Sequence, residues 1–266
     1  ALATSIKVTP ALFIPYFAYK RQWRVVAWSC VGLLVFTIFV PGIVLGFERT
    51  WWLLNSWSGA MIEPYVLHGK VETLQTNQSL PGVWMRLVTN SPGLELEDGT
   101  TRPVNLISVD YHAALWGLKA LLVGLIAWIA WLCRAPTTDR SNSRLTYEFA
   151  LVFIAMLLVS ERSWKHHFVV MLLPYATVLA CAWRNACGSR MRKWIWASLA
   201  AAFLAMASTS TELVGWLGDG NGHKYAQAYG LFCASAVLVF VVLSVILSNA
   251  HDAASLTIGS ESSAQR

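Results

Sequence analysis

A run of cationic and imidazole side chains separates two apolar segments of the sequence. It contains Arg162, Lys165, His166 and His167 within the stretch SERSWKHH. Donors of this kind bind phosphate through charge-assisted hydrogen bonds and stabilise the negative charge that builds up on a leaving group. Because only a few residues join the flanking apolar segments, the donors cannot move away from the membrane surface. The run therefore predicts a phosphate site at headgroup depth, with simple binding of lipid headgroups as the alternative.

A second polar stretch, NQSLPGVWMR, places an arginine on a short helix. Ser79 is a suitable N-cap, and Pro81 fits the first helical turn. With that start, Ser79, Gly82 and Arg86 share one face of the helix, while apolar side chains occupy the other. An arginine among small and polar residues can clamp an anion. The alternative is an arginine whose charged end simply reaches water from a loop helix.

The same stretches predict neither a metal site nor a cofactor. His166 and His167 are adjacent, so on a helix their side chains point about 100° apart. The sequence contains no HxxxH, HExxH or DxD spacing that would collect metal ligands. Facing histidines on separate apolar segments, which a bis-histidine haem needs, are not evident either.

The elements that must position these residues are membrane segments. Of the 266 residues, 56% are hydrophobic and only 13% are charged, against roughly 25% charged residues in soluble globular proteins. The mean hydropathy is +0.51. These values exclude a disordered chain, a disulfide-stapled secreted module and an ordinary cytosolic enzyme. The net charge is +6, but the cations form small clusters between apolar blocks, so a nucleic-acid partner is not expected.

The apolar blocks predict an all-α, polytopic transmembrane helical bundle with about seven segments and one long external loop. Residues 1–248 are expected to form the transmembrane region, with the external loop over 48–111, followed by a polar cytoplasmic tail over 249–266. The loop opens with a tryptophan-rich stretch, including Trp57, Met61 and Ile62, that is expected to lie in the headgroup layer. The predicted segments are 4–19, 23–47, 112–133, 145–160, 166–183, 194–211 and 226–248.

The positions of the cations predict the orientation in a cell membrane. Short joints on one side carry dense clusters of Lys and Arg, whereas the joints on the other side carry fewer over a longer stretch. By the positive-inside rule the clusters face the cytoplasm, and the loop with both polar stretches faces outward. The clusters are Lys20, Arg21 and Arg24; Arg134, Arg140 and Arg144; and Arg184, Arg190, Arg192 and Lys193.

Several charged residues lie within or beside the apolar segments. Lys7, beside Pro10, is predicted to take part in the site, because an intramembrane charge is otherwise costly; outward snorkelling is the alternative. Glu148 is predicted to be an interfacial or paired carboxylate rather than a proton relay. Asp110 is predicted to pair with Lys119, although it is also a second candidate for a catalytic base if the chain is complete.

Three motifs resemble elements of glycosyltransferase family 87. The run Ser163-Trp164-x-His166-His167 with Pro174 after it is similar to the family's SW-x-HH…P signature. Asn77-Gln78-Ser79-Leu80-x-Gly82 with Arg86 is similar to its NQSL-x-G…R element. Ile6-Lys7-x-Thr9-Pro10 followed by Lys20-Arg21-x-Trp23-Arg24 is similar to its K-x-TP…RRW element. The motifs occur in the family's order, over residues 6 to about 174.

The resemblance implies a GT-C architecture and a polyprenyl-phosphate-mannose-dependent mannosyltransferase. The reaction would be inverting transfer of the sugar from this donor to a hydroxyl of a lipid or glycan acceptor, at the external face of the membrane. The resemblance gives His166, His167 and Arg86 the role of stabilising the leaving phosphate, with Lys165 and Lys7 as supporting cations. Binding of sugar hydroxyls or the phosphate would fall to the neighbouring motif residues, which are Asn77, Gln78, Ser79, Ser163 and Trp164.

The family also carries a catalytic carboxylate in its first external loop, upstream of the motif at Lys7. The chain is therefore expected to lack this residue and to be inactive by itself. A transporter or lipid flippase is the main alternative, although charged residues in mid-membrane and a twofold internal repeat, which would favour it, are not evident. An inactive remnant is the other alternative.

Overall fold

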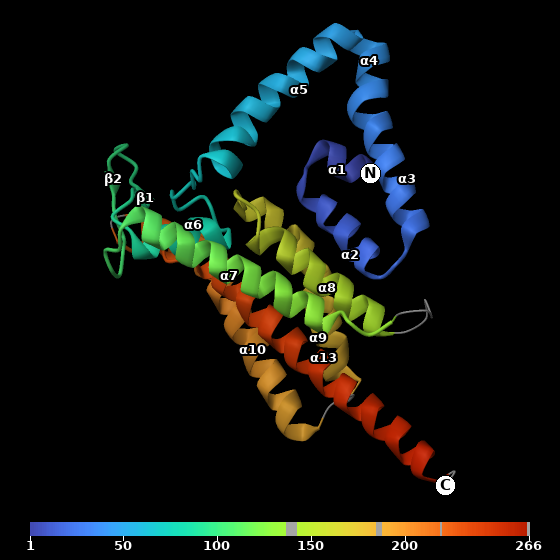
Figure 1. Cartoon of the computed structure of the whole chain (residues 1–266). Coiled ribbons are helices and arrows are strands. Elements are labelled where there is room, and N and C mark those ends of the chain that lie inside the picture. Colours follow the sequence, from blue (N-terminus) through green and yellow to red (C-terminus); the bar gives the residue numbers. More distant parts are fainter. Residues whose placement is uncertain (137–142, 185–187, 219, 265–266) are drawn as a thin grey trace.

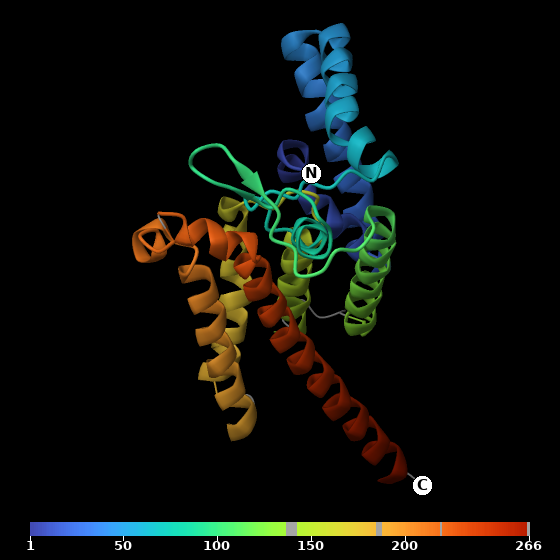
Figure 2. The same ribbon diagram turned by 90° about the vertical axis from the view of Figure 1, so that its left-hand side faces the viewer.

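The computed structural model describes residues 1–136, 143–184, 188–218 and 220–264. In these ranges the regular elements are helices, apart from one two-stranded hairpin, and loops join them. Figures 1 and 2 show long helices gathered into a bundle, from which a helical hairpin projects. The predicted all-α polytopic membrane fold is confirmed, since four helical stretches of the described chain are long and apolar enough to cross a membrane. They are Trp23–Leu45, Tyr111–Leu132, Lys165–Trp183 and Leu231–Asn249.

The predicted segment 4–19 is not one continuous helix. Helix α1 ends at Ile6, and Lys7 has an extended backbone with φ −146° and ψ 127°. The 3₁₀ turn η1 then starts with Pro10 in its first turn. Pro10 has no N–H to donate to the carbonyl of Ile6, four residues back, and its ring crowds this carbonyl, which explains why α1 ends at Ile6. The elements are α1 (Leu2–Ile6), η1 (Thr9–Leu12) and α2 (Phe13–Tyr19).

The next elements form the projecting hairpin, called the arm below. They are α3 (Trp23–Leu34), the π-helical turn η2 (Val35–Phe39), α4 (Val40–Leu45) and α5 (Phe47–Met61). The π turn lies just before Pro41, which cannot donate a backbone hydrogen bond. Apolar side chains such as Trp28, Ile43 and Trp51 are exposed along the arm.

The predicted loop 48–111 contains several short elements after α5. They are η3 (Glu63–Leu67), α6 (Leu80–Val88), β1 (Leu94–Glu95) and β2 (Thr101–Arg102). The two strands are antiparallel, with Leu94 opposite Arg102. The predicted start of α6 is confirmed, because the Oγ of Ser79 accepts a hydrogen bond from the N–H of Gly82 at 3.2 Å and Pro81 lies in the first turn.

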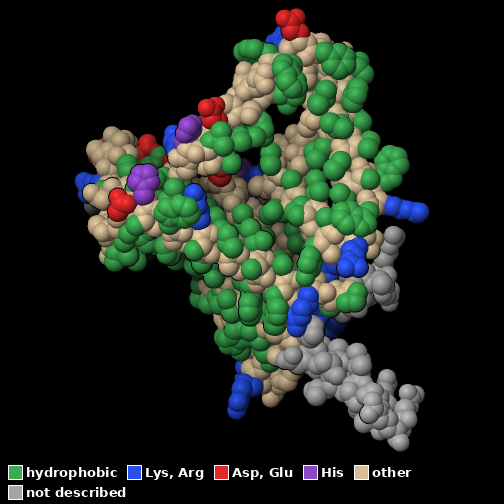
Figure 3. All heavy atoms as spheres, viewed as in Figure 1, with side chains coloured by type: hydrophobic (Ala, Val, Ile, Leu, Met, Phe, Trp, Pro, Cys, Tyr) green, Lys and Arg blue, Asp and Glu red, His purple; other side chains and the backbone are tan. Residues whose placement is uncertain are grey.

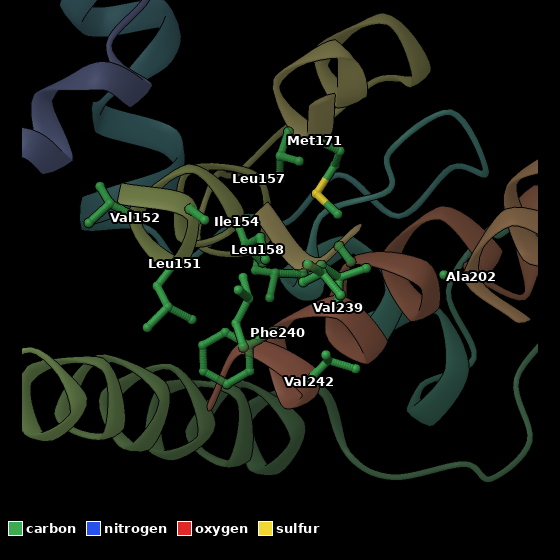
Figure 4. Close-up of a cluster of buried hydrophobic side chains, with 14 of the residues drawn as sticks. Leu151, Val152, Ile154, Leu157, Leu158, Met171, Ala202, Val239, Phe240 and Val242 are labelled. Carbon is green, nitrogen blue, oxygen red and sulfur yellow. The ribbon is translucent and has the colours of Figure 1, made fainter. Parts of the chain in front are cut away.

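The remaining predicted apolar segments are helices of the bundle. Helix α8 is central, and almost every residue from 150 to 158 is buried. Figure 4 shows its Leu157 beside Met171 of η4 and its Leu158 beside Val239 of α13. The elements are α7 (Tyr111–Leu132), α8 (Ser143–Leu158), η4 (Lys165–Met171), α9 (Leu172–Trp183), α10 (Ser189–Ala207), α11 (Thr211–Val214), α12 (Gly222–Ala228) and α13 (Leu231–Ala264).

Helix α13 continues through most of the predicted polar tail, since it ends at Ala264. Residues 265–266 of that tail and Arg140 of the second basic cluster lie outside the described residues. The cytoplasmic placement of the tail and of the basic clusters stays a prediction.

The predicted pair between Asp110 and Lys119 is wrong. Asp110 instead caps α7, because its Oδ1 accepts the N–H groups of His112 at 3.0 Å and Ala113 at 3.1 Å. Lys119 lies over the ring of Trp116, with 4.8 Å from Nζ to the centroid. Nine residues span about 13 Å along a helix, which is too far for the pair.

Glu148 is a fully buried, paired carboxylate, as predicted. Its Oε2 lies 2.8 Å from Lys20 Nζ, and its Oε1 lies 3.1 Å from Arg144 Nε. The hydroxyl of Tyr16 also donates to Oε2 at 2.7 Å. Because Arg144 donates in addition to the carbonyl of Leu132 at 2.6 Å, this cluster joins α2, α7 and α8 at the end of the bundle opposite α6.

Replacing Glu148 by alanine is expected to lower the free energy of unfolding by about 3 kcal/mol, because it leaves two largely buried cations without their counter-charge. Unfolding by SDS titration in mixed micelles measures the change. The matched control is Glu95→Ala, at an exposed position in β1, with an expected change below about 0.5 kcal/mol. Equal stability of the Glu148 variant and the wild type would show that the cluster is not stabilising.

Candidate active site

A cavity of about 770 Å³ lies between α1–η1, the arm and the end of α8. In Figure 3 the surface is hollowed where the arm meets the rest of the molecule. The volume lies within the usual range of sites for small molecules and cofactors. Of the predicted site residues, Lys7, Trp164 and His167 line this cavity. Its wall is mostly apolar and includes Ile6, Leu12, Trp57, Met61, Ile62 and Val159.

Lys7 reaches the cavity because the helix breaks at this residue. Its extended backbone separates α1 from η1, and both flank the cavity. In a continuous helix, the lysine side chain would instead point in the same direction as the other side chains on its face of the helix. Pro10 is therefore the local sequence signal for the helix break at Lys7.

His167 is held in one tautomer by the backbone of the hairpin between α8 and η4. Its Nδ1 accepts a hydrogen bond from the N–H of Trp164 at 3.0 Å. The two rings are stacked, with 5.8 Å between centroids and 9° between planes. A neutral imidazole that accepts at Nδ1 carries its proton at Nε2. His167 can therefore donate a hydrogen bond to a ligand in the cavity.

The structure does not bring Lys165 or His166 into the lining of the cavity. Lys165 is exposed and its Nζ donates to the carbonyl of Thr209 at 3.0 Å. The ring of His166 packs edge-on against His167, with 4.3 Å between centroids. The roles expected of His166 at the leaving phosphate and of Lys165 as a supporting cation therefore stay predictions. Their sequence neighbours Trp164 and His167 face the cavity instead.

The two polar stretches found in the sequence are in direct contact. Asn77 Nδ2 donates to the carbonyl of Glu161 at 2.7 Å, and Asn77 Oδ1 accepts the N–H of Ser163 at 3.0 Å. The N–H of Gln78 donates to the carbonyl of Ser163 at 2.7 Å. Ser79 Oγ adds a longer bond of 3.3 Å to the Glu161 carbonyl. These bonds fix the hairpin that carries His167 against the start of α6.

Asn77, Gln78, Ser79 and Ser163 are buried, so their expected binding of sugar hydroxyls or the phosphate stays a prediction. None of the four is more than 1% exposed. Ser163 Oγ donates to the carbonyl of Leu157 at 2.7 Å. Gln78 Nε2 donates to the carbonyls of Gln75 and Gln227, at 2.6 and 2.7 Å. These side chains support the wall of the site from inside the protein, and they do not line the cavity.

Arg86 also points into the protein and does not line this cavity, so its contact with the phosphate stays a prediction. Its side chain is 0% exposed, and burial lowers its pKa to about 10, which leaves it protonated at neutral pH. Every acceptor of its guanidinium is a backbone carbonyl. These are Ala228 (2.6 Å from Nε), Thr73, Leu74 and Asn77 (2.9, 2.8 and 3.1 Å from Nη1) and Gln227 (3.2 Å from Nη2).

Sequence reasoning missed several residues of the cavity. Trp57 and Met61 were predicted only to lie in the headgroup layer; four residues apart on α5, they share one helix face and line the cavity. Glu161 lines the cavity beside the predicted donors, and no role in the site was predicted for it from the sequence. Among the described residues, no group of three His, Cys, Asp or Glu side chains could hold a metal ion.

Two curated proteins are similar to this chain. One, from Mycobacterium tuberculosis, is named polyprenol-phosphate-mannose-dependent alpha-(1-2)-phosphatidylinositol mannoside mannosyltransferase; it is 26% identical over 190 residues, which cover 69% of this chain and 36% of the relative. A protein with the same name from Mycolicibacterium smegmatis is 25% identical over 252 residues, covering 93% of this chain and 50% of the relative. The chain thus spans half or less of the length of either relative. No solved structure matches it.

The family comparison covers the amino-terminal elements, the arm, α6, α7 and α8. The sequence model of glycosyltransferase family 87 matches residues 1–161. This range includes Lys7 and the Asn77–Arg86 stretch, and it stops just before the hairpin residues Ser163 and His167. Since the match extends over more than half of the 266 residues, the chain belongs to glycosyltransferase family 87.

Proposed function

We propose that the protein is a membrane mannosyltransferase that takes its sugar from a polyprenyl-phosphate donor and passes it to an acceptor hydroxyl at the external membrane face, with inversion. The single observation that carries this proposal is the composition of the cavity. Lys7 and the Nε2 of His167 supply positive charge and a donor, while the rest of the wall is mostly apolar. A lipid that carries one phosphate between a sugar and an isoprenoid chain matches this arrangement.

The proposed chemistry needs the cavity to stabilise a departing phosphate. The acceptor oxygen attacks the anomeric carbon, the bond from this carbon to the phosphate oxygen breaks, and polyprenyl phosphate leaves with the electron pair. The hydroxyl proton passes to a general base, for which a carboxylate is the expected group. Hydrogen bonds and positive charge aimed at the phosphate lower the barrier, because negative charge grows there in the transition state.

We propose a mannosylated inositol phospholipid as the acceptor class, following the names of the two relatives. The test uses membranes that contain the full-length protein, labelled polyprenyl-phosphate mannose and phosphatidylinositol mannosides. Label is expected to move to the inositol lipid. No incorporation above membranes that lack the protein would overturn the proposed function.

The Lys7→Gln variant is expected to raise the KM for the donor about fivefold, since a charged partner of the phosphate is replaced by a neutral one. The same transfer assay measures it. The matched control is Lys119→Gln, because Lys119 is exposed on α7 and does not line the cavity. An equal KM for the Lys7 variant and the wild type would show that Lys7 does not contact the phosphate.

A further inference from the structure

We infer that Glu161 recognises the sugar of the donor by accepting hydrogen bonds from its hydroxyl groups. This inference rests on the proposed function and assigns to the same cavity a second polar contact, distinct from the phosphate contacts. Carboxylate oxygens only accept hydrogen bonds. A pyranose presents several hydroxyl donors on one face, so a carboxylate is a suitable partner for it and an unsuitable one for phosphate.

Glu161 lines the cavity, and its carboxylate has no partner among the described residues. Within the described parts of the chain, no donor or cation lies within bonding distance of its oxygens, and only its backbone carbonyl is bonded. The adjacent Arg162 does not neutralise it at close range. The Nη2 of Arg162 instead donates to Glu72 Oε2 at 3.3 Å and to the hydroxyl of Tyr65.

Glu161 has lost part of its hydration. Burial raises the pKa of this carboxyl above its ordinary value, and the positive charge of Arg162 offsets only part of this effect. A carboxylate that has lost hydrogen bonds to water and has gained none from the protein is stabilised when a bound ligand donates hydrogen bonds to it. Hydroxyl groups of a bound sugar can supply them at this position.

The backbone at Glu161 is rigidly positioned. Its carbonyl accepts Asn77 Nδ2 at 2.7 Å and Ser79 Oγ at 3.3 Å. Two residues later, Ser163 is bonded to Asn77 and Gln78 through its N–H and its carbonyl. The buried NQS stretch therefore holds the backbone of Glu161 as firmly as that of His167, which is the arrangement expected for a recognition site.

The polar lining of the cavity also carries both signs of charge. Lys7 and the Nε2–H of His167 suit the phosphate, whereas Glu161 disfavours a second phosphate and suits uncharged hydroxyls. A sugar linked through a single phosphate satisfies both. Removal of Glu161 should therefore affect lipids that carry the sugar and spare the lipid phosphate without it.

The test compares two probes, polyprenyl-phosphate mannose and polyprenyl phosphate, bound to the full-length protein in nanodiscs. Glu161→Ala is expected to weaken binding of the mannosyl lipid about tenfold and to leave polyprenyl phosphate within twofold of the wild type. Glu161→Gln keeps one acceptor oxygen and is expected to lose about threefold for the mannosyl lipid. The matched control is Glu97→Ala, at an exposed position in the turn between β1 and β2.

The outcomes separate this inference from the function on which it rests. Unchanged binding of both lipids by Glu161→Ala overturns the inference, and so does equal weakening of both, which would indicate damage to the whole site. Tighter binding of both lipids would make Glu161 a counter-charge of Lys7 and also overturn it. If the wild type binds neither lipid, the proposed function itself fails.

Discussion

Replacing His167 by alanine is expected to lower the turnover of the full-length protein at least tenfold, while the amount of folded protein in the membrane stays the same. The residue lines the cavity and presents Nε2–H as a donor, since Nδ1 is occupied by the N–H of Trp164. Loss of one preorganised donor at a developing negative charge costs about 10²–10³ in turnover at enzyme sites where it has been measured. Initial rates per mole of folded protein measure the effect.

A second substitution at His167 tests whether the donor at Nε2 is the group that supports turnover. Glutamine places an amide N–H near the position of Nε2, so His167→Gln is expected to recover a substantial part of the turnover lost with alanine. His166→Ala is expected to lose about threefold, because His166 supports the ring of His167 at 4.3 Å and lies outside the lining. His112→Ala on α7 is the neutral control. If His167→Ala had wild-type turnover, His167 would not stabilise the leaving phosphate.

The helices were predictable because their signals are local. The Ser79 cap follows from a hydroxyl, a proline and an apolar stripe within a few residues, and the Oγ bond to Gly82 confirms it. The apolar segments likewise follow from runs of side chains that lipid or the bundle must cover. Pro10 carries a local signal too, but its consequence, an extended Lys7 inside an apolar segment, was not foreseen.

The contact between the two polar stretches could be anticipated only from their chemistry, and its form could not. Helical spacing puts Ser79, Gly82 and Arg86 on one face, but it does not say whether this face meets a cavity or the protein interior. The acceptors of Arg86 include Thr73, before α6, and Ala228, which is 142 residues away. Any residue can supply a backbone carbonyl, so carbonyls that the fold brings together leave no pattern in the sequence. The burial of Arg86 among them could therefore be seen only in the structure.

Replacing Arg86 by methionine is expected to destabilise the protein by more than about 5 kcal/mol. The substitution keeps an unbranched side chain of similar length but removes every guanidinium donor from five backbone carbonyls. The carbonyls of Leu74 and Gln227 keep other donors, so the loss falls mainly on those of Thr73, Asn77 and Ala228. A buried acceptor without its donor costs about 1–3 kcal/mol. Such a loss is comparable with the whole stability of many domains. Fluorescence-detected size-exclusion chromatography after heating measures the folded fraction.

The variants of Arg86 and His167 should both lower total activity, but for opposite reasons. Arg86→Met is expected to reduce the quantity of folded protein and to leave turnover per folded molecule near the wild-type value, because Arg86 does not reach the cavity. Arg102→Met, at an exposed position in β2, serves as the control. If the Arg86→Met protein were fully folded but had greatly reduced turnover, Arg86 would have to contact the phosphate. Helix α6 would then have to turn toward the cavity during the reaction.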